Sequence, residues 1–145
     1  MFLFWSTNMI LAINLKIVGA LLVALGVAHG AFSKRFEWKT DLAKLSLLNR
    51  QIFLVHCFFI ALSLVLMGGV TLFYTDALLQ PAPLSRVVLV AVVVFWLCRL
   101  FIQFFVYDSM LWRGNRFNTW MHVLFSLFWT YVVLTYFFAA QHVWR

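Results

Sequence analysis

The sequence predicts an all-α integral membrane protein: a four-transmembrane-helix bundle with a short interfacial amphipathic helix between spans 1 and 2. Composition is the first reason, because 66% of the 145 residues are hydrophobic and 10% are charged, whereas about half of a soluble domain is apolar. The second reason is that the apolar residues fall into four runs, each close to the ~20 residues that cross a ~30 Å hydrocarbon core. The third is an aromatic content of 17 Phe, 7 Trp and 4 Tyr, which suits lipid and its interfaces.

The four apolar runs define the spans in order. We predict a single transmembrane domain, residues 1–145, with spans at about 9–32, 52–75, 87–107 and 119–140. We expect the first run to be a retained span rather than a cleaved signal peptide. Its GVAHG stretch spaces Gly26 and Gly30 for close helix approach. Pro81 and Pro83 exclude a continuous helix between the second and third spans.

The segment 33–51, between the first two spans, mixes charged residues with apolar ones. Phe36, Trp38 and Leu42 are among the apolar positions, and their spacing suits a helix that lies at the membrane interface. Thr40 and Asp41 have the side chains that begin helices. We therefore expect the interfacial helix to start there and to turn or continue into the second span.

The basic residues predict an orientation. One side of the membrane receives Lys34, Arg35, Lys39, Lys44, Arg50, Arg113 and Arg116, and the other receives Lys16, Arg86 and Arg145. The positive-inside rule places the richer side in the cytoplasm. We expect both termini outside a bacterial inner (plasma) membrane. Because the cations flank apolar runs, the net charge of +7 indicates contact with the lipid bilayer and no nucleic-acid partner.

Polar residues from all four spans recur at one depth. Arg99, Gln103 and Tyr107 form a stripe on the third span, and His122, Ser126 and Thr130 form one on the fourth. His29, His56, Arg99, Gln103 and His122 all fall within roughly 4–12 Å of the cytoplasmic boundary at ~1.5 Å per helical residue. An ionisable group facing lipid costs several kcal/mol, so we expect these side chains to face the bundle interior.

This layer suits two redox cofactors. A haem b needs two imidazoles at similar depth, and His56 and His122 are the predicted iron ligands, with His29 as an alternative. Arg50, Arg99 or Arg116 would pair with the propionates. The same layer would also suit a quinone or a lipid head group, with hydrogen-bond donors, a proton relay and an aromatic wall supplied by the Arg99–Gln103–Tyr107 stripe, Asp108, Trp112 and a histidine.

Other functions use the same residues. A lipid-headgroup binding or lipid-modifying protein would use Arg99 and Arg50 as a phosphate clamp. A non-catalytic subunit or assembly partner, within a larger membrane complex or a homodimer, would need the polar residues only to fix helix packing, with Arg99 neutralised by Asp108 or by carbonyl groups at a helix end. No GxSxG, HExxH, CxxC or glycine-rich phosphate loop occurs, so hydrolase, disulfide-exchange and nucleotide-binding motifs are absent and the question of an enzyme stays open.

The cysteines and a short repeated pattern are two further features of the sequence. Cys57 and Cys98 have no metal-ligand spacing and are expected to be small core residues. An R-x5-H-x2-F pattern begins at both Arg50 and Arg116, which indicates either two related helical hairpins or a coincidence.

Overall fold

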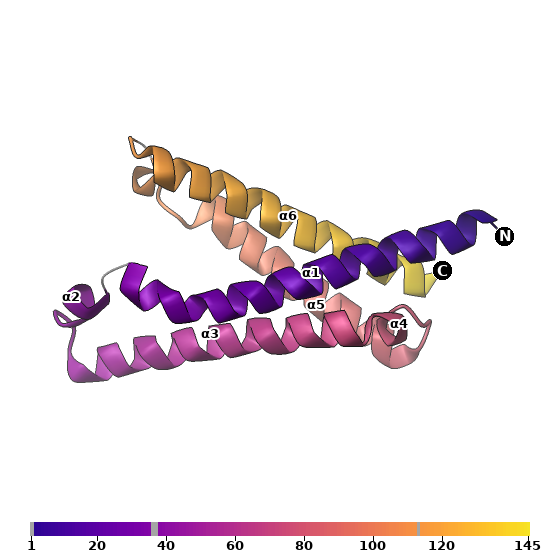
Figure 1. Cartoon of the computed structure of the whole chain (residues 1–145), viewed down its shortest axis with the longest axis horizontal. Coiled ribbons are helices and arrows are strands. Elements are labelled where there is room, and N and C mark those ends of the chain that lie inside the picture. Colours follow the sequence, from indigo (N-terminus) through magenta and orange to yellow (C-terminus); the bar gives the residue numbers. More distant parts are fainter. Residues whose placement is uncertain (1, 36–37, 113) are drawn as a thin grey trace. The chain divides into compact units, whose positions relative to one another are not determined.

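The fold is a succession of helices. A computed structural model describes the backbone of residues 2–35, 38–112 and 114–145, and the side chains of residues 8–32, 38, 40–110, 112 and 114–145. The elements of this part are α1 (Phe2–Arg35), α2 (Trp38–Leu42), α3 (Leu47–Phe73), α4 (Thr75–Leu78), α5 (Pro83–Phe105), the 3-10 helix η1 (Ser109–Leu111) and α6 (Arg116–Trp144) (Figure 1). Four of them, α1, α3, α5 and α6, are long and apolar enough to span a membrane. The predicted all-helical fold with four candidate spans is confirmed.

The helix ends follow local capping chemistry more closely than they follow the apolar runs. Ser46 begins α3, because its Oγ accepts the N–H of Asn49 at 3.3 Å. The predicted helix start at Thr40 and Asp41 is wrong, since both residues lie inside the short α2. Pro83 occupies the first turn of α5, where a missing N–H costs nothing.

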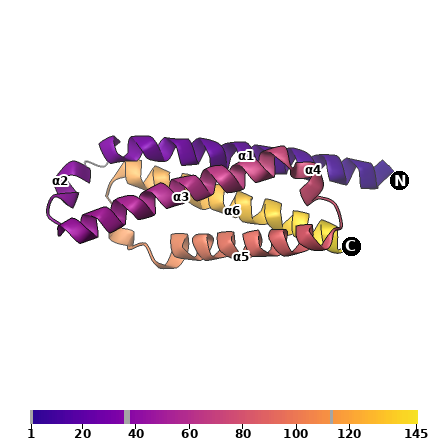
Figure 2. The same cartoon turned by 90° about the horizontal axis from the view of Figure 1, so that it is seen from below.

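The chain divides into two compact units, residues 15–75 and residues 1–14 with 76–145. In the first of these units, α1 and α3 run antiparallel and side by side (Figure 2). Their closest approach is made by glycines: a Cβ built on Gly68 would lie 2.7 Å from the carbonyl oxygen of Gly19, and one on Gly26 would also meet α3. Gly30 has nothing within 4 Å of such a Cβ. The predicted close approach of the GVAHG stretch therefore holds for Gly26 and not for Gly30.

In the second unit, α5 and α6 form an antiparallel hairpin, side by side in both views (Figures 1 and 2). Its seam is apolar over most of its length. Buried residues of α5 include Leu89, Val93 and Trp96, spaced three or four apart, and they are matched on α6 by residues such as Val132 and Tyr136. This spacing puts one stripe of each helix against the other.

Two polar contacts stabilise the second unit, one between the start of α5 and the end of α6 and one between α6 and α1. The Nε of Arg86, in the first turn of α5, donates to the carbonyl oxygen of Val143 at 2.9 Å. This bond satisfies one of the carbonyls that the last turn of α6 leaves without a helical partner. The hydroxyl of Tyr131 on α6 donates to Oδ1 of Asn14 on α1 at 2.7 Å, which ties the first part of α1 to the hairpin.

Several hydroxyl side chains in the long helices, and that of Thr75 just after α3, bond to carbonyl oxygens of a helical turn. Hydroxyl groups bond to the carbonyl oxygen four residues earlier, at 2.6 to 2.9 Å, in Thr71, Thr75, Ser126, Thr130 and Thr135. Such back-bonding removes the need for a partner on another helix. The predicted stripe of Ser126 and Thr130 thus bonds within α6 rather than across the hairpin.

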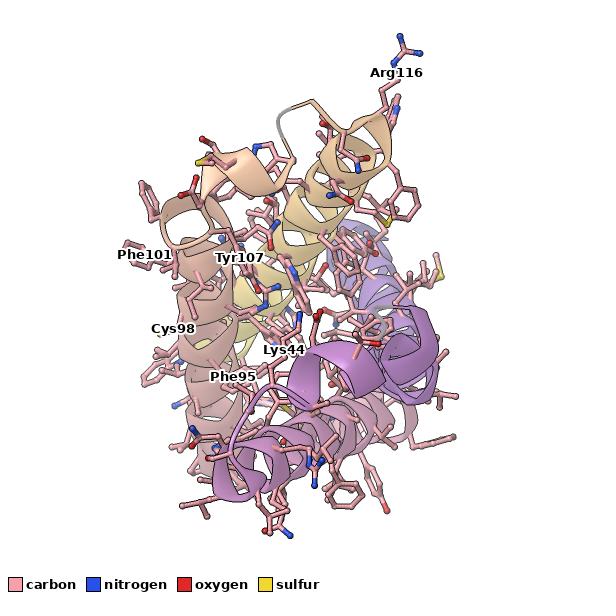
Figure 3. All side chains as sticks on the ribbon, turned by 90° about the vertical axis from the view of Figure 1, so that its left-hand side faces the viewer. Lys44, Phe95, Cys98, Phe101, Tyr107 and Arg116 are labelled. Carbon is pink, nitrogen blue, oxygen red and sulfur yellow. The ribbon has the colours of Figure 1, made fainter. Side chains whose placement is uncertain are left out.

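The sequence-based orientation rests partly on residues outside this description. The side chains of Lys34, Arg35, Lys39 and Arg113 and all of Phe36 lie outside the described residues. Among the others, Arg116 is exposed, and Figure 3 shows it extending away from the first turn of α6.

Candidate functional site

The candidate site lies at the end of the α5–α6 hairpin where the two helices are connected. The connection is locally ordered: Oδ1 of Asp108 accepts the N–H of Met110 at 2.8 Å and starts η1. Gly114 then takes a left-handed conformation with φ of 85°, which favours glycine. The hydroxyl of Thr119 donates to the carbonyl oxygen of Trp112 at 2.8 Å, and this bond fixes Trp112 beside the start of α6.

Three of the predicted site residues meet here. Nη1 of Arg99 donates to Oε1 of Gln103 at 3.2 Å, one helical turn further along α5. Nε2 of Gln103 lies 3.1 Å from Nδ1 of His122 on α6. Gln103 is 4% exposed, while Arg99 and His122 are half-buried. A three-residue hydrogen-bond chain therefore joins the two helices.

Aromatic rings lie around the three hydrogen-bonded residues Arg99, Gln103 and His122. The guanidinium carbon of Arg99 lies 4.7 Å from the ring centroid of Trp129 and 5.8 Å from that of Tyr107, the fourth predicted residue. The His122 ring stacks on Trp112 with a centroid distance of 3.8 Å and an angle of 14°. Cation–π contacts of this kind stabilise a cation by ~0.5–2 kcal/mol. We call Arg99, Gln103, His122, Tyr107, Trp112 and Trp129 the polar cluster.

Next to the polar cluster, two buried indole rings pack against each other between α5 and α6. Trp96 stacks on Trp129 at 5.0 Å with an interplanar angle of 19°. The two side chains are 2% and 4% exposed, and neither indole N–H has a hydrogen-bond partner among the described residues. Buried donors of this kind are rare and call for an explanation.

From the sequence, the aromatic residues in general are related to lipid and its interfaces, and Trp96 and Trp129 are not singled out. The spacing carried a signal, because Trp96 precedes Arg99 by three residues and Trp129 follows His122 by seven. Both separations keep two residues on one helix face.

Among the residues that the structure describes, no carboxylate forms an ion pair with Arg99. The ion pair found among the described residues joins Lys44 to Asp41 at 3.4 Å, and both side chains are exposed. The expectation that Asp108 neutralises Arg99 is wrong, since the carboxylate of Asp108 caps η1 instead. Arg99 keeps its charge beside aromatic faces and one amide oxygen.

No protein-family model, no curated protein and no solved structure matches this chain. The function therefore has to be argued from the residues themselves.

The remaining two predicted residues, His29 and His56, belong to the α1–α3 unit. Nδ1 of His29 lies 2.7 Å from the carbonyl oxygen of Leu25, and Nδ1 of His56 lies 2.8 Å from that of Ile52. A carbonyl only accepts, so each Nδ1 carries the proton and each Nε2 presents a lone pair. This is the form that metal-ligating histidines take.

In His122 the proton is on the other ring nitrogen, and this affects its suitability as a ligand of the predicted haem iron. Its Nδ1 faces an amide nitrogen that donates, so its Nε2 carries the proton and cannot ligate iron. His56 fits an iron ligand and His122 in this hydrogen bond does not. The haem b prediction stays a prediction, and it requires His122 to lose the bond from Gln103. A Soret band in purified protein, lost in His56→Ala and His122→Ala, would establish it.

The hydrogen-bonding groups that Arg99 and His122 leave available are all donors. A guanidinium carries several N–H donors and no acceptor, and Arg99 uses one donor on Gln103. His122 presents a second free donor at Nε2. Both groups are partly exposed, so a ligand that offers acceptor oxygens can reach them.

Proposed function

We propose that this chain is a four-span inner-membrane protein whose polar cluster binds the head group of a quinone. In this proposal the four long helices form one bundle, α2 lies at the interface and both termini are outside. The polar cluster then lies near the cytoplasmic leaflet, because the connection between α5 and α6 is on that side.

The exposed apolar surface supports membrane insertion. Phe73 is 79% and Phe105 is 73% exposed, which water would penalise and hydrocarbon would not. Figure 3 shows Phe95, Cys98 and Phe101 along the side of α5 that points away from α6. A lipid environment accounts for this face.

One observation supports quinone above the other ligands: the polar cluster combines free donors with a flat aromatic wall. Quinone carbonyl oxygens are acceptors, which Arg99 and the Nε2–H of His122 can serve. Trp112 stacks on His122 with one face and offers its other face to a planar head group. The buried Trp129 lies behind the guanidinium of Arg99. A bound quinone ring would accept hydrogen bonds from donors that have no partner among the described residues.

A second candidate is the phosphate of an anionic lipid, and the uncompensated charge of Arg99 favours it. A permanent cation without a carboxylate in an apolar helix attracts an anion, and arginine binds phosphate through two parallel hydrogen bonds. Phosphate needs no aromatic wall, however, and the two tryptophans would then serve only Arg99 and His122.

The experiment uses the full-length protein in nanodiscs made of phosphatidylcholine. Quenching of tryptophan fluorescence by a short-chain ubiquinone measures binding, since two tryptophans belong to the polar cluster. We expect Arg99→Leu to weaken binding at least about tenfold, because a hydrogen bond from a charged donor contributes ~1.5–3 kcal/mol and ~1.4 kcal/mol is a factor of ten. Arg116→Leu is the matched control, because it removes an exposed cation outside the polar cluster.

The outcomes separate the candidates. Equal quinone binding by Arg99→Leu and Arg116→Leu would refute a quinone site at Arg99. Phosphatidylglycerol retained on the wild-type protein in native mass spectrometry, and lost in Arg99→Leu without any effect of quinone, would establish the lipid site. A protein that retains neither ligand but isolates in a stable complex would be a non-catalytic partner whose polar cluster fixes helix packing.

A further inference from the structure

The direction of each hydrogen bond in the chain from Arg99 to His122 follows from chemistry. Arg99 has no acceptor, so the atom of Gln103 that it meets at 3.2 Å must be the amide oxygen. The amide nitrogen of Gln103 then faces Nδ1 of His122 at 3.1 Å and must donate to it. An Nδ1 that accepts cannot carry a proton. The proton of a neutral His122 imidazole is therefore on Nε2.

The surroundings hold this arrangement in place. Gln103 is 4% exposed, so water has little access to compete for its amide. The Trp112 ring lies 3.8 Å from the His122 ring and nearly parallel to it, which restricts rotation of the imidazole. A flipped amide would set two donors against each other at Arg99. Arg99 thus determines the tautomer of His122 indirectly, because it fixes the orientation of the Gln103 amide that contacts the imidazole.

We infer that Gln103 is a positioning residue that makes the polar cluster select the oxidised form of its ligand, a quinone, over the reduced quinol. This inference rests on the proposed function. The free groups of Arg99 and His122 are all donors, and a quinone offers carbonyl oxygens that only accept. A quinol carries O–H protons, and these find no acceptor on either residue.

The size of the preference follows from the cost of an unpaired polar group. Leaving one buried donor without a partner weakens binding by about tenfold or more. We therefore expect the quinone to bind at least about tenfold more tightly than the corresponding quinol. No electron transfer is involved in this comparison, which concerns binding alone.

Gln103→Glu tests the role of the amide. A carboxylate only accepts, so it can receive hydrogen bonds from Arg99 and from Nδ1–H of His122 at the same time. The imidazole then presents its Nε2 lone pair, which accepts a quinol O–H. We expect the preference for quinone to fall to parity or to reverse. Gln141→Glu, at an exposed position near the end of α6, is the matched control and should keep the wild-type preference.

Two measurements keep this inference separate from the proposed function. The first is nitrogen-15 NMR of histidine-labelled protein in lipid at about pH 9, where imidazoles are ordinarily neutral, with the His122 signal identified by its loss in His122→Phe. It reports the tautomer without any ligand. We expect Nε2–H in the wild type and Nδ1–H in Gln103→Glu. Nδ1–H in the wild type would overturn the inference whether or not a quinone binds.

The second measurement compares the affinities for a short-chain ubiquinone and its quinol in nanodiscs under anaerobic conditions. Equal affinities in the wild type would overturn the selectivity and leave the proposed quinone site standing. Binding of neither form would overturn the proposed function, and the selectivity with it. The expected tautomer, a preference for quinone and its loss only in Gln103→Glu would together establish the inference.

Discussion

The close approach of α1 and α3 gives the sharpest test of the packing. Gly68 and Gly69 are neighbours in α3 but differ in surroundings. A Cβ on Gly68 would lie 2.7 Å from the carbonyl oxygen of Gly19 and 2.9 Å from the backbone nitrogen of Val23, whereas one on Gly69 meets nothing within 4 Å. Gly68→Ala should therefore destabilise the α1–α3 hairpin, and Gly69→Ala should not.

The magnitude follows from the distances. The backbone of α1 cannot rotate out of the way as a side chain can, so the helices must separate by ~0.7 Å to restore ordinary contact near 3.4 Å. A gap of this size removes a quarter to a half of the dispersion energy of the affected atom pairs. Overpacking of this kind costs ~1–3 kcal/mol. Both substitutions gain the same ~1 kcal/mol of helix propensity, so the difference between the two variants isolates the packing term.

The assay is reversible unfolding of both variants in mixed micelles, followed by circular dichroism. We expect Gly68→Ala to be less stable than Gly69→Ala by ~1–3 kcal/mol. Equal stability of the two, or a more stable Gly68→Ala, would show that α1 and α3 do not pack through Gly19 and Gly68.

Three further outcomes are expected. Tyr131→Phe should lower the free energy of unfolding by ~0.6 kcal/mol, the average for a hydrogen bond between membrane helices, because the bond to Asn14 is lost. Thr130→Val removes a hydroxyl that bonds within α6 and should lower it less. Equal losses in the two variants would contradict the assigned bond between Tyr131 and Asn14. Arg86→Ala should speed hydrogen exchange in the last turn of α6, because the carbonyl of Val143 loses its donor; unchanged exchange there would argue against this cap. Single cysteines added at each terminus of a cysteine-free variant should both react with an impermeant maleimide in intact cells, and protection of either would reverse the proposed orientation.

The sequence was sufficient to predict an all-helical chain with four long apolar helices and the contacts of Arg99, Gln103 and His122. Four apolar runs predicted four long helices, and the four-residue spacing of Arg99 and Gln103 predicted a shared face. Comparing depths then indicated that His122 lies at the level of Gln103, and the 3.1 Å contact agrees. These predictions succeeded because helix rise and periodicity are nearly independent of sequence.

Other contacts lay beyond sequence reasoning for physical reasons. Asn14 was visible as a polar residue in an apolar run, but its partner Tyr131 is 117 residues away and is one hydroxyl among many. The start of the interfacial helix was misplaced because Thr40 and Asp41 can both cap a helix, yet they lie inside α2, and only geometry decides which competent residue acts as a cap. The tautomer of His122 depends on the direction of two hydrogen bonds, which residue types and spacing do not encode.

The back-bonded hydroxyls have a consequence for biogenesis. A span whose Ser and Thr side chains already bond to its own backbone can leave the translocon and enter lipid without waiting for a neighbour. The amide oxygen of Gln103 is satisfied within α5 by Arg99, but its amide nitrogen is paired with His122 of α6. If the helices insert one after another, this nitrogen of α5 has no such partner until α6 has emerged from the ribosome.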